Sequence, residues 1–312
     1  MKKGIKNRGQ WLFYGCMVAI PLLHFCMFYV YVNINSIMLA FKSYDPKISD
    51  FVWNKSSEIF KNFSTVFKMF TDSTYAPGNF SQAMGNSFRN SILIKLLGLS
   101  IRLPLSLVFS WYVYKKKVGS NAFRIILYLP QIISSVTMVT MFIPVMDIVV
   151  PNFISKILGV EAQSFFAPKK EFATYLFYYI WSSFGASVLI YSGTMTSISD
   201  SIIEAAEVDG ITPFQEFIRI VLPMIWPTIA TFLVASLADM FGDQLNLFTF
   251  NRTEAYPEHS TVGYFLYQQM KKGDPTSRFP TLSAMGLCLT FITIPAVLLF
   301  RWFTNKINPM KD

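Results

Sequence analysis

Long uncharged apolar stretches are the feature that most limits how this chain can fold. The stretch from Trp11 to Ala40 contains only His24 as a residue of the Asp, Glu, Lys, Arg and His types, and residues 172–198 contain none. Each stretch is longer than the roughly 20 residues that cross the apolar core of a bilayer. Because 53% of the 312 residues are apolar and only 14% are charged, the composition also lies outside that of ordinary soluble domains. These patterns predict an all-α membrane protein.

Six apolar stretches predict six transmembrane helices in a single domain that covers residues 1–312. The expected spans are about 12–40, 92–114, 125–146, 172–198, 220–239 and 281–300. The first stretch is about twice as long as the apolar region of a secretory signal peptide, which has about 7 to 15 residues. We therefore expect it to remain as the first helix. An even number of spans places both termini on the same side of the membrane.

The basic residues between the spans give the expected orientation. Their totals on the two sides are similar, but the residues on one side are spread over segments about twice as long. The two densest clusters lie before the first span and after the second: Lys2, Lys3, Lys6 and Arg8, then Lys115, Lys116, Lys117 and Arg124. Cationic residues in short loops favour the cytosolic side. We therefore expect both termini and the loop 199–219 in the cytosol.

The net charge and the cysteines do not indicate other kinds of site. The net charge is +9, but a nucleic-acid-binding surface needs basic residues on one face, and here they are divided among short segments. Cys16, Cys26 and Cys288 all fall within expected spans. Free cysteines in such positions act as small buried apolar residues, so we expect neither disulfides nor a metal site.

The loop 199–219, between the fourth and fifth spans, has the pattern of two helices joined by a sharp turn. Ser201 followed by Glu204 fits a capping box at the start of a helix. Gly210 can adopt the left-handed conformation that ends a helix. Thr212–Pro213 then begins a second helix, because proline is well tolerated at the first helical position.

The first helix of this loop is expected to contact a protein partner. With about eight residues it is too short to be stable alone in water, and Ala205 and Ala206 permit a close approach to another surface. The loop contains only one basic residue, Arg219, and five acidic ones: Asp200, Glu204, Glu207, Asp209 and Glu216. An acidic helix on the basic side of the membrane predicts charge-assisted pairing with a partner that presents Arg or Lys.

These residues resemble a known family. The pattern E-A-A-x-x-D-G, followed about eleven residues later by L-P, is the signature of the permease subunits of binding-protein-dependent ABC importers. The matching positions are Glu204, Ala205, Ala206, Asp209, Gly210, Leu222 and Pro223. Asn86–Ser87, Phe123–Arg124 and Leu129–Pro130 are also similar to the sugar-permease branch, typified by the maltose and glycerol-phosphate systems. The resemblance covers roughly residues 12–308.

The resemblance implies a type I importer fold and a set of partners. In that family the loop 199–219 is the cytosolic coupling helix, which docks in a groove of the ATPase subunit. Glu204 would pair with a cationic group of the ATPase, Ala205 and Ala206 would pack at the contact, and Gly210 would set the turn. The implied partners are a second permease subunit, of a different chain, two ATPase subunits and an extracytoplasmic binding protein, in a prokaryotic plasma membrane.

The same resemblance implies that this chain is not an enzyme. ATP and Mg²⁺ would be bound by the partner ATPase subunits, and this chain would bind no cofactor. The sequence agrees, because it contains no G-x-x-x-x-G-K-[ST] loop. A membrane-embedded enzyme is also disfavoured, since His24 and His259 are the only histidines and neither H-E-x-x-H nor G-x-S-x-G occurs.

Polar and aromatic residues in or beside the spans are candidates for a solute pathway. A charge within a bilayer usually faces the protein interior or a polar path. Lys95 and Arg102, seven residues apart, lie on one face of the second span. An ion pair between the second and fifth spans, or contact with lipid head groups, is an alternative role for such charges. The candidate pathway residues are Asp239, Asp243, Gln244, Asn246, Trp181 and Tyr191.

The sequence leaves the transported solute open. Many sugar permeases carry a G-G-P segment soon after the fifth span, whereas residues 248–257 here read FTFNRTEAYP. A carbohydrate is the expected solute, and a peptide, a polyamine or phosphate is the alternative. An ion-coupled secondary transporter is an alternative class, although the sequence lacks the inverted repeats typical of that class.

Overall fold

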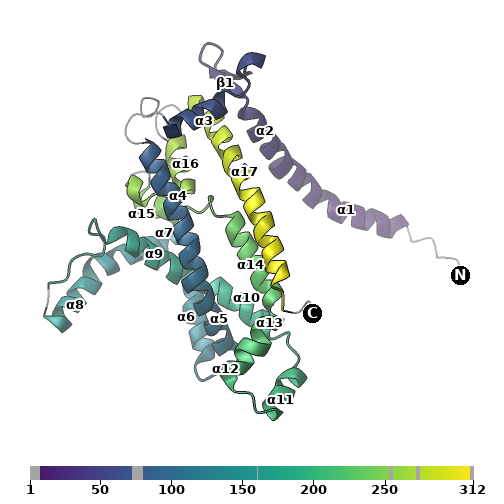
Figure 1. Cartoon of the computed structure of the whole chain (residues 1–312), viewed down its shortest axis with the longest axis vertical. Coiled ribbons are helices and arrows are strands. Elements are labelled where there is room, and N and C mark those ends of the chain that lie inside the picture. The colour runs from purple at the N-terminus through teal and green to yellow at the C-terminus, as the bar shows by residue number, and fades with distance from the viewer. Residues whose placement is uncertain (1–7, 72–79, 160, 253–255, 272–274, 310–312) are drawn as a thin grey trace. The chain divides into compact units, whose positions relative to one another are not determined.

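The computed structural model describes residues 8–71, 80–159, 161–252, 256–271 and 275–309. The described chain is mostly helical and contains one two-stranded sheet (Figure 1). It forms two compact units, of which one contains Met1–Pro77 and Gln269–Thr290 and the other Gly78–Gln268 and Phe291–Asp312. The basic residues Lys2, Lys3 and Lys6 lie outside the described residues, so the orientation inferred from them stays a prediction.

The first unit begins with a long apolar helical stretch. It comprises α1 (Arg8–Phe25), a π-helical segment η1 (Cys26–Tyr31) and α2 (Val32–Leu39). The described side chains from Phe13 to Ile37 are exposed. A continuous exposed apolar surface of this size is typical of a contact with lipid or with another subunit.

A small sheet follows this stretch in the first unit. Strands β1 (Lys42–Asp45) and β2 (Asp50–Trp53) pair antiparallel, with Lys42 opposite Trp53. A short 3₁₀ turn η2 (Ser56–Glu58) and helix α3 (Lys61–Thr71) complete the segment. The Asn62 side-chain amide donates to the carbonyl oxygens of Ala40 and Lys42, each at 2.7 Å. These bonds join α3 to the end of α2, because a buried amide must find acceptors within the protein.

The second unit contains the helices that form the sites described below. In chain order these are α4 (Phe80–Leu97), η3 (Gly98–Arg102), α5 (Leu103–Tyr114), α6 (Ser120–Ile132), α7 (Ser135–Pro144), η4 (Val145–Val149), α8 (Val150–Leu158), α9 (Glu171–Ser182), α10 (Phe184–Met195), α11 (Asp200–Val208), α12 (Pro213–Glu216), η5 (Phe217–Val221), α13 (Leu222–Met224), α14 (Trp226–Ala238), α15 (Leu247–Asn251) and η6 (Pro257–His259). Helices α16 (Val262–Lys271) and α17 (Pro275–Lys306) contribute residues to both units.

Five helical stretches among the described residues are long and apolar enough to cross a bilayer. They are Phe13–Leu39, Gln82–Tyr114, Ser135–Leu158, Glu171–Met195 and Ser277–Lys306. A sixth candidate, Pro213–Met224 followed by Trp226–Ala238, is bent by 67°. The bend lies at Ile225, between Pro223 and Pro227. Pro227 has no backbone N–H to donate to the carbonyl of Pro223, so one helical hydrogen bond is missing at this point. The chain is thus a mostly helical membrane protein with five or six candidate spans among its described residues.

The expected third span, 125–146, is wrong as a single helix. Helix α6 ends at Ile132, Ile133 and Ser134 are extended with ψ of 140° and 136°, and a new helical stretch runs from Ser135 to Leu158. Pro130 removes a backbone donor in the last turn of α6, and the β-branched Ile132 and Ile133 favour extended backbone after it. Hydropathy stays high across this break, so an apolar pattern cannot reveal it.

A buried apolar cluster of the second unit joins the loop 199–219 to the long helices. It contains residues from α5, α10, α11, η5 and α14, together with Ile198 and Ile225: Leu107, Tyr191, Met195, Ile198, Ile203, Phe217, Val221, Ile225 and Ile229. Helix α10 also packs against α6 at a very close crossing, where a Cβ atom on Gly185 would lie 2.6 Å from the carbonyl oxygen of Leu127. Glycine is required there because any side chain would overlap the backbone of α6.

A buried polar network ties the segment after α15 to the long helices. The Glu171 carboxylate, at the start of α9, accepts a hydrogen bond from the Tyr175 hydroxyl and lies 3.3 Å from His259 Nδ1. On the other side, the Asn90 side chain of α4 donates to the carbonyl oxygens of Glu258 and Ser260, at 2.7 and 3.0 Å. Buried polar groups need such partners, and these contacts together fix the position of η6.

Candidate functional site

Helix α11 begins two residues earlier than the sequence pattern indicates. Its N-cap residue is Ser199, and its first helical residue is Asp200. Ser201 therefore lies inside the first turn, where its hydroxyl is 2.8 Å from the hydroxyl of Ser199. The expected capping box of Ser201 and Glu204 is wrong. Asp200 instead supplies a negative charge in the first turn, which the positive end of the helix dipole favours.

The glycine turn after α11 is confirmed. Gly210 has φ of 77°, in the left-handed region that glycine adopts without strain. Its N–H donates to the carbonyl of Glu207 at 3.1 Å, and the N–H of Ile211 donates to the carbonyl of Ala206 at 3.2 Å. These two bonds satisfy carbonyl groups that the end of a helix leaves free.

The second helix of the loop starts with the predicted cap. Thr212 and Gln215 form a capping box, in which the Gln215 N–H donates to the Thr212 hydroxyl and the Thr212 N–H donates to the Gln215 side chain. Pro213 occupies the first helical position. Together with the turn at Gly210, this cap fixes the angle between the two helices of the loop (Figure 1).

Two contacts attach one face of α11 to the rest of the second unit. The Ile203 side chain is buried in the cluster that also contains Phe217. Lys115, which directly follows α5, lies 3.8 Å from Glu207 of α11 and 2.7 Å from Glu216 of α12, measured from its ammonium nitrogen to the nearest carboxylate oxygen. The loop is therefore held to the end of α5 by both apolar packing and charge.

The opposite face of the loop is exposed and carries both acidic and apolar groups. Glu204, Ala205, Asp209 and Gly210 are exposed, and Ala206 is half-buried. The side chains of two apolar residues protrude beside them, with Val208 87% and Phe214 69% exposed. Leu222 and Pro223, the last two residues of the family signature, are half-buried, and Leu222 packs against the cluster. The structure thus brings the first part of the signature to the surface and places the second part in the packing.

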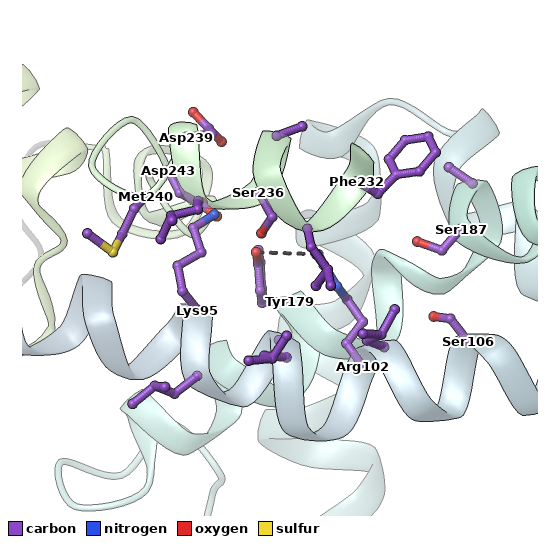
Figure 2. Close-up of a pocket in the computed structure, with 18 of the residues that line it drawn as sticks. Lys95, Arg102, Ser106, Tyr179, Ser187, Phe232, Ser236, Asp239, Met240 and Asp243 are labelled. Atoms are coloured by element: carbon purple, nitrogen blue, oxygen red, sulfur yellow. Dashed lines mark hydrogen bonds and ion pairs between the residues drawn. The ribbon is translucent and has the colours of Figure 1, made fainter. Parts of the chain in front are cut away.

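A cavity of about 570 Å³ lies between the long helices of the second unit. Its lining comes from α4, η3 and α5, from α9, α10 and α14 with the segment that follows α14, and from Phe300 of α17 (Figure 2). Lys95 and Asp243 form an ion pair in this wall, with 3.1 Å between Nζ and Oδ2 and side chains only 12% and 17% exposed. Asp243 Oδ1 also accepts from the N–H of Leu245 at 2.9 Å. The ion pair therefore joins α4 to the non-helical segment between α14 and α15, and both of its residues also line the cavity.

Arg102 lines the same cavity next to a tyrosine. One guanidinium N–H group donates to the Tyr179 hydroxyl at 3.4 Å, and the guanidinium carbon lies 5.5 Å from the centre of the Tyr179 ring. The serine hydroxyl groups of the lining belong to Ser106, Ser187 and Ser236, and aromatic surface comes from Phe232 and Tyr191 as well as Tyr179. Aromatic faces next to hydrogen-bonding groups suit a solute that has both apolar faces and hydroxyl groups.

The structure brings together only some of the residues that the sequence suggested for a solute pathway. Asp239, Asp243 and Tyr191 line the cavity. Gln244, Asn246 and Trp181 do not belong to its lining: Asn246 is the N-cap residue of α15, and the Trp181 ring packs on the ring of Phe142, with 6.1 Å between centroids. Lys95 and Arg102, which their spacing predicts to lie on one helix face, both line the cavity.

The chain is similar in sequence to a known protein family and to individual transport proteins. Residues 102–310 match the family described as "Binding-protein-dependent transport system inner membrane component". The probable ABC transporter permease protein MG188 homolog of Mycoplasma pneumoniae is 24% identical over 260 residues, which is 79% of this chain and 75% of that protein. The sn-glycerol-3-phosphate transport system permease protein UgpA of Escherichia coli is 23% identical over 306 residues, which is 96% of this chain and 97% of UgpA.

A solved structure shows the same fold. One chain of a bacterial ABC transporter involved in the import of the acidic polysaccharide alginate superimposes with a TM-score of 0.74 at 23% identity, over 96% of this chain and 97% of that one. The helical arrangement of the present chain is therefore that of this transporter chain.

Proposed function

This chain belongs to the binding-protein-dependent transport system inner membrane components, and on that premise we propose that it forms half of the translocation pathway for a carbohydrate. It is the permease subunit of a bacterial ABC importer and a multi-pass membrane protein. Subunits of this kind carry no ATPase site and bind no cofactor, because ATP is bound by the separate ATPase subunits. The proposal concerns the solute, the coupling segment and the partners.

The loop 199–219 couples the permease to its ATPase, with α11 as the docking helix. The observation that carries this proposal is the division of α11 into two faces. One face is attached through Ile203 and through Glu207 with Lys115, and the other presents Glu204 beside the exposed Val208. Exposed apolar side chains next to charged ones on a fixed element are typical of a protein interface. Glu204 then pairs with a cationic group of the ATPase.

The buried cluster that anchors α11 transmits a movement of this helix to the cavity. Ile203 of α11 packs in one cluster with Leu107 of α5 and Ile229 of α14. Arg102 directly precedes α5, and Phe232 and Ser236 belong to α14, so both helices lead to the cavity wall. Because close-packed clusters move as units rather than deforming continuously, closure of the ATPase subunits would rearrange the walls of the cavity.

The cavity supports the proposal of a carbohydrate as the solute. Its volume of about 570 Å³ lies within the roughly 300–1,000 Å³ of typical small-molecule sites. The rings of Tyr179, Tyr191 and Phe232 offer faces for the apolar side of a sugar ring, and Asp239 offers a carboxylate for hydroxyl groups. UgpA is named for a polyol phosphate and the alginate transporter for a polysaccharide, which is consistent with such a solute.

The complete transporter, as proposed, contains two permease subunits, two ATPase subunits and a separate binding protein. A second permease of a different sequence completes the pathway, two ATPase subunits bind the coupling loops, and an extracytoplasmic binding protein delivers the solute. In this arrangement the chain has six spans, the bent stretch from Pro213 to Ala238 is the fifth, and both termini lie in the cytosol of the plasma membrane.

Reconstitution of the assembled complex in proteoliposomes tests this function. We expect uptake of a carbohydrate that requires ATP inside, binding protein outside and both permeases, and that persists when ionophores abolish all ion gradients. Uptake driven by an ion gradient in the absence of the ATPase subunits would contradict the proposal. ATP-driven uptake of a peptide or polyamine, but of no carbohydrate, would contradict the proposed solute class alone.

A further inference from the structure

Arg102 occupies an unusual electrostatic position within its span. It is the last residue of the π-helical segment η3, inside the membrane-crossing stretch Gln82–Tyr114, and it lines the cavity. A guanidinium group stays charged under all physiological conditions. Placing a charge at this depth is costly unless it faces a polar path and has a partner of opposite charge.

The partners of Lys95 and Arg102 differ, although both side chains lie on the same helix face. Lys95 has its own counterion, because Asp243 lies 3.1 Å away. Within the described part of the chain, no carboxylate forms an ion pair with Arg102, and its hydrogen-bond partner is the neutral hydroxyl of Tyr179 at 3.4 Å. Lys95 is thus paired directly with a carboxylate, whereas Arg102, among the described residues, is held by a neutral hydroxyl with no carboxylate in direct contact.

We propose that Arg102 binds an anionic group of the transported solute, so that the solute is a carbohydrate bearing a carboxylate, phosphate or sulfate. This inference rests on the proposed function. The Tyr179 hydroxyl accepts from one N–H group of the guanidinium, and the ring centre lies 5.5 Å from the guanidinium carbon. The other N–H groups remain to bind a carboxylate or phosphate in the two-pronged geometry that arginine favours.

The rest of the cavity determines how such a solute is oriented. Figure 2 shows Asp239, Asp243 and Lys95 together on one side of Tyr179, and Arg102 on the other side. The carboxylates repel an anionic group and accept hydrogen bonds from hydroxyl groups. An acidic sugar therefore binds with its charged group toward Arg102 and its hydroxyl groups toward Asp239. Ser106 and Ser187, which Figure 2 shows on the Arg102 side, add donors for the anion.

Direct binding to the assembled transporter in nanodiscs tests the inference. The probes are hexuronate oligosaccharides and hexose phosphates, each paired with its neutral hexose counterpart. Binding is measured by titration without the binding protein, so that the selectivity of the binding protein does not affect the measured affinities. We expect at least one anionic probe to bind about tenfold or more tightly than its neutral counterpart. Arg102→Gln should weaken that binding by roughly tenfold to a hundredfold, the range for a hydrogen bond to a charged group, and should weaken the binding of the neutral counterpart much less.

Two further variants separate charge and geometry from a general loss of structure. Arg102→Lys keeps the charge but not the two-pronged geometry, so we expect an intermediate affinity. Arg89→Gln removes an exposed arginine of the same long helix that does not line the cavity, and it should bind like the wild type. Absence of binding to every anionic probe, a preference for the neutral counterparts, or unchanged binding in Arg102→Gln would overturn the inference.

ATP-driven uptake measured with the same complex distinguishes this inference from the proposed function. If the wild type imports a neutral carbohydrate and binds no anionic probe, the proposed function stands and the role of Arg102 is wrong. If the complex imports no carbohydrate with ATP, the proposed function is wrong whatever the titrations give.

Discussion

The ammonium nitrogen of Lys115 lies 2.7 Å from Oε1 of Glu216, and the Glu216 side chain is only 3% exposed. This ion pair connects the residue that follows α5 to the second helix of the loop 199–219. Lys115 also lies 3.8 Å from Glu207 of α11. A single cation thus links the end of one long helix to both helices of the proposed coupling loop.

Removing this cation should impair coupling more than assembly. Lys115→Met leaves the Glu216 carboxylate buried without its partner, which costs up to about 3–5 kcal/mol for a fully buried pair, and less here because Lys115 is 20% exposed. We expect a lower melting temperature of the purified complex and a several-fold loss of ATP hydrolysis stimulated by the loaded binding protein. Lys117→Met, at an exposed lysine two residues away, is the control. Restoration of coupling by exchanging the two charges, Lys115→Glu with Glu216→Lys, would support the link, and normal coupling in Lys115→Met would exclude it.

The close crossing of α10 and α6 predicts a strong size limit at Gly185. A Cβ atom there would lie 2.6 Å from the carbonyl oxygen of Leu127, so Gly185→Val should lower the yield of folded complex and its melting temperature. A Cβ atom on Gly193, in the same helix, would meet no atom of the described residues within 4 Å, and Gly193→Ala should leave both quantities near the wild-type values. Equal yields of the two variants in a detergent-solubilised, size-exclusion assay would show that the crossing is looser than these distances indicate.

The lining of the cavity predicts different outcomes for two neighbouring residues. Asp243 lines the cavity and pairs with Lys95, whereas Gln244 is not part of the lining. Asp243→Asn should reduce the rate or apparent affinity of solute uptake by roughly tenfold, since breaking the pair leaves Lys95 uncompensated at a cost above about 1.4 kcal/mol. Gln244→Ala should change uptake by less than about twofold. The initial rate of uptake as a function of solute concentration measures both effects, and the reverse order would show that the cavity is not the pathway.

The turn at Gly210 predicts a graded effect of substitution. A non-glycine residue in the left-handed region costs roughly 1–2 kcal/mol, so Gly210→Ala should reduce coupled ATP hydrolysis only in part. Proline fixes φ near −65°, far from the 77° of Gly210, and removes the N–H group that donates to Glu207. Gly210→Pro should therefore abolish coupled hydrolysis while the chain still inserts in the membrane. Equal activity of the two variants would mean that the turn is not needed for docking.

The membrane character and the turn at Gly210 could be predicted because each depends on local chemistry. Long apolar stretches must be covered by lipid or by other helices whatever the fold. A glycine directly after a short helix is typical of a turn in the left-handed conformation. The break at Ile133 could not be predicted in this way, because both sides of it are equally apolar. Pro130 marks the position, but prolines inside membrane helices often cause no break at all.

The residues of the cavity were harder to predict than the coupling loop. Gln244 and Trp181 have the right chemistry for a sugar, yet they lie outside the lining, because the direction of a side chain depends on how the helices pack. Tyr179 could not be distinguished by pattern among the many aromatic residues of its span. Arg102 was detectable as a charge in an apolar stretch, but only the structure shows that, among the described residues, Lys95 has a counterion and Arg102 does not.

Glu204 provides the most direct test of the account, because it is exposed on the face of α11 that is proposed to contact the ATPase. The measurement is ATP hydrolysis by the reconstituted complex with and without loaded binding protein, for the variants Glu204→Lys and Glu161→Lys. Glu161 is an exposed acidic residue outside the loop and serves as the control. We expect Glu204→Lys to insert and assemble normally but to lose the stimulation by the binding protein, and Glu161→Lys to keep it. Full stimulation in Glu204→Lys would contradict docking of the ATPase on α11.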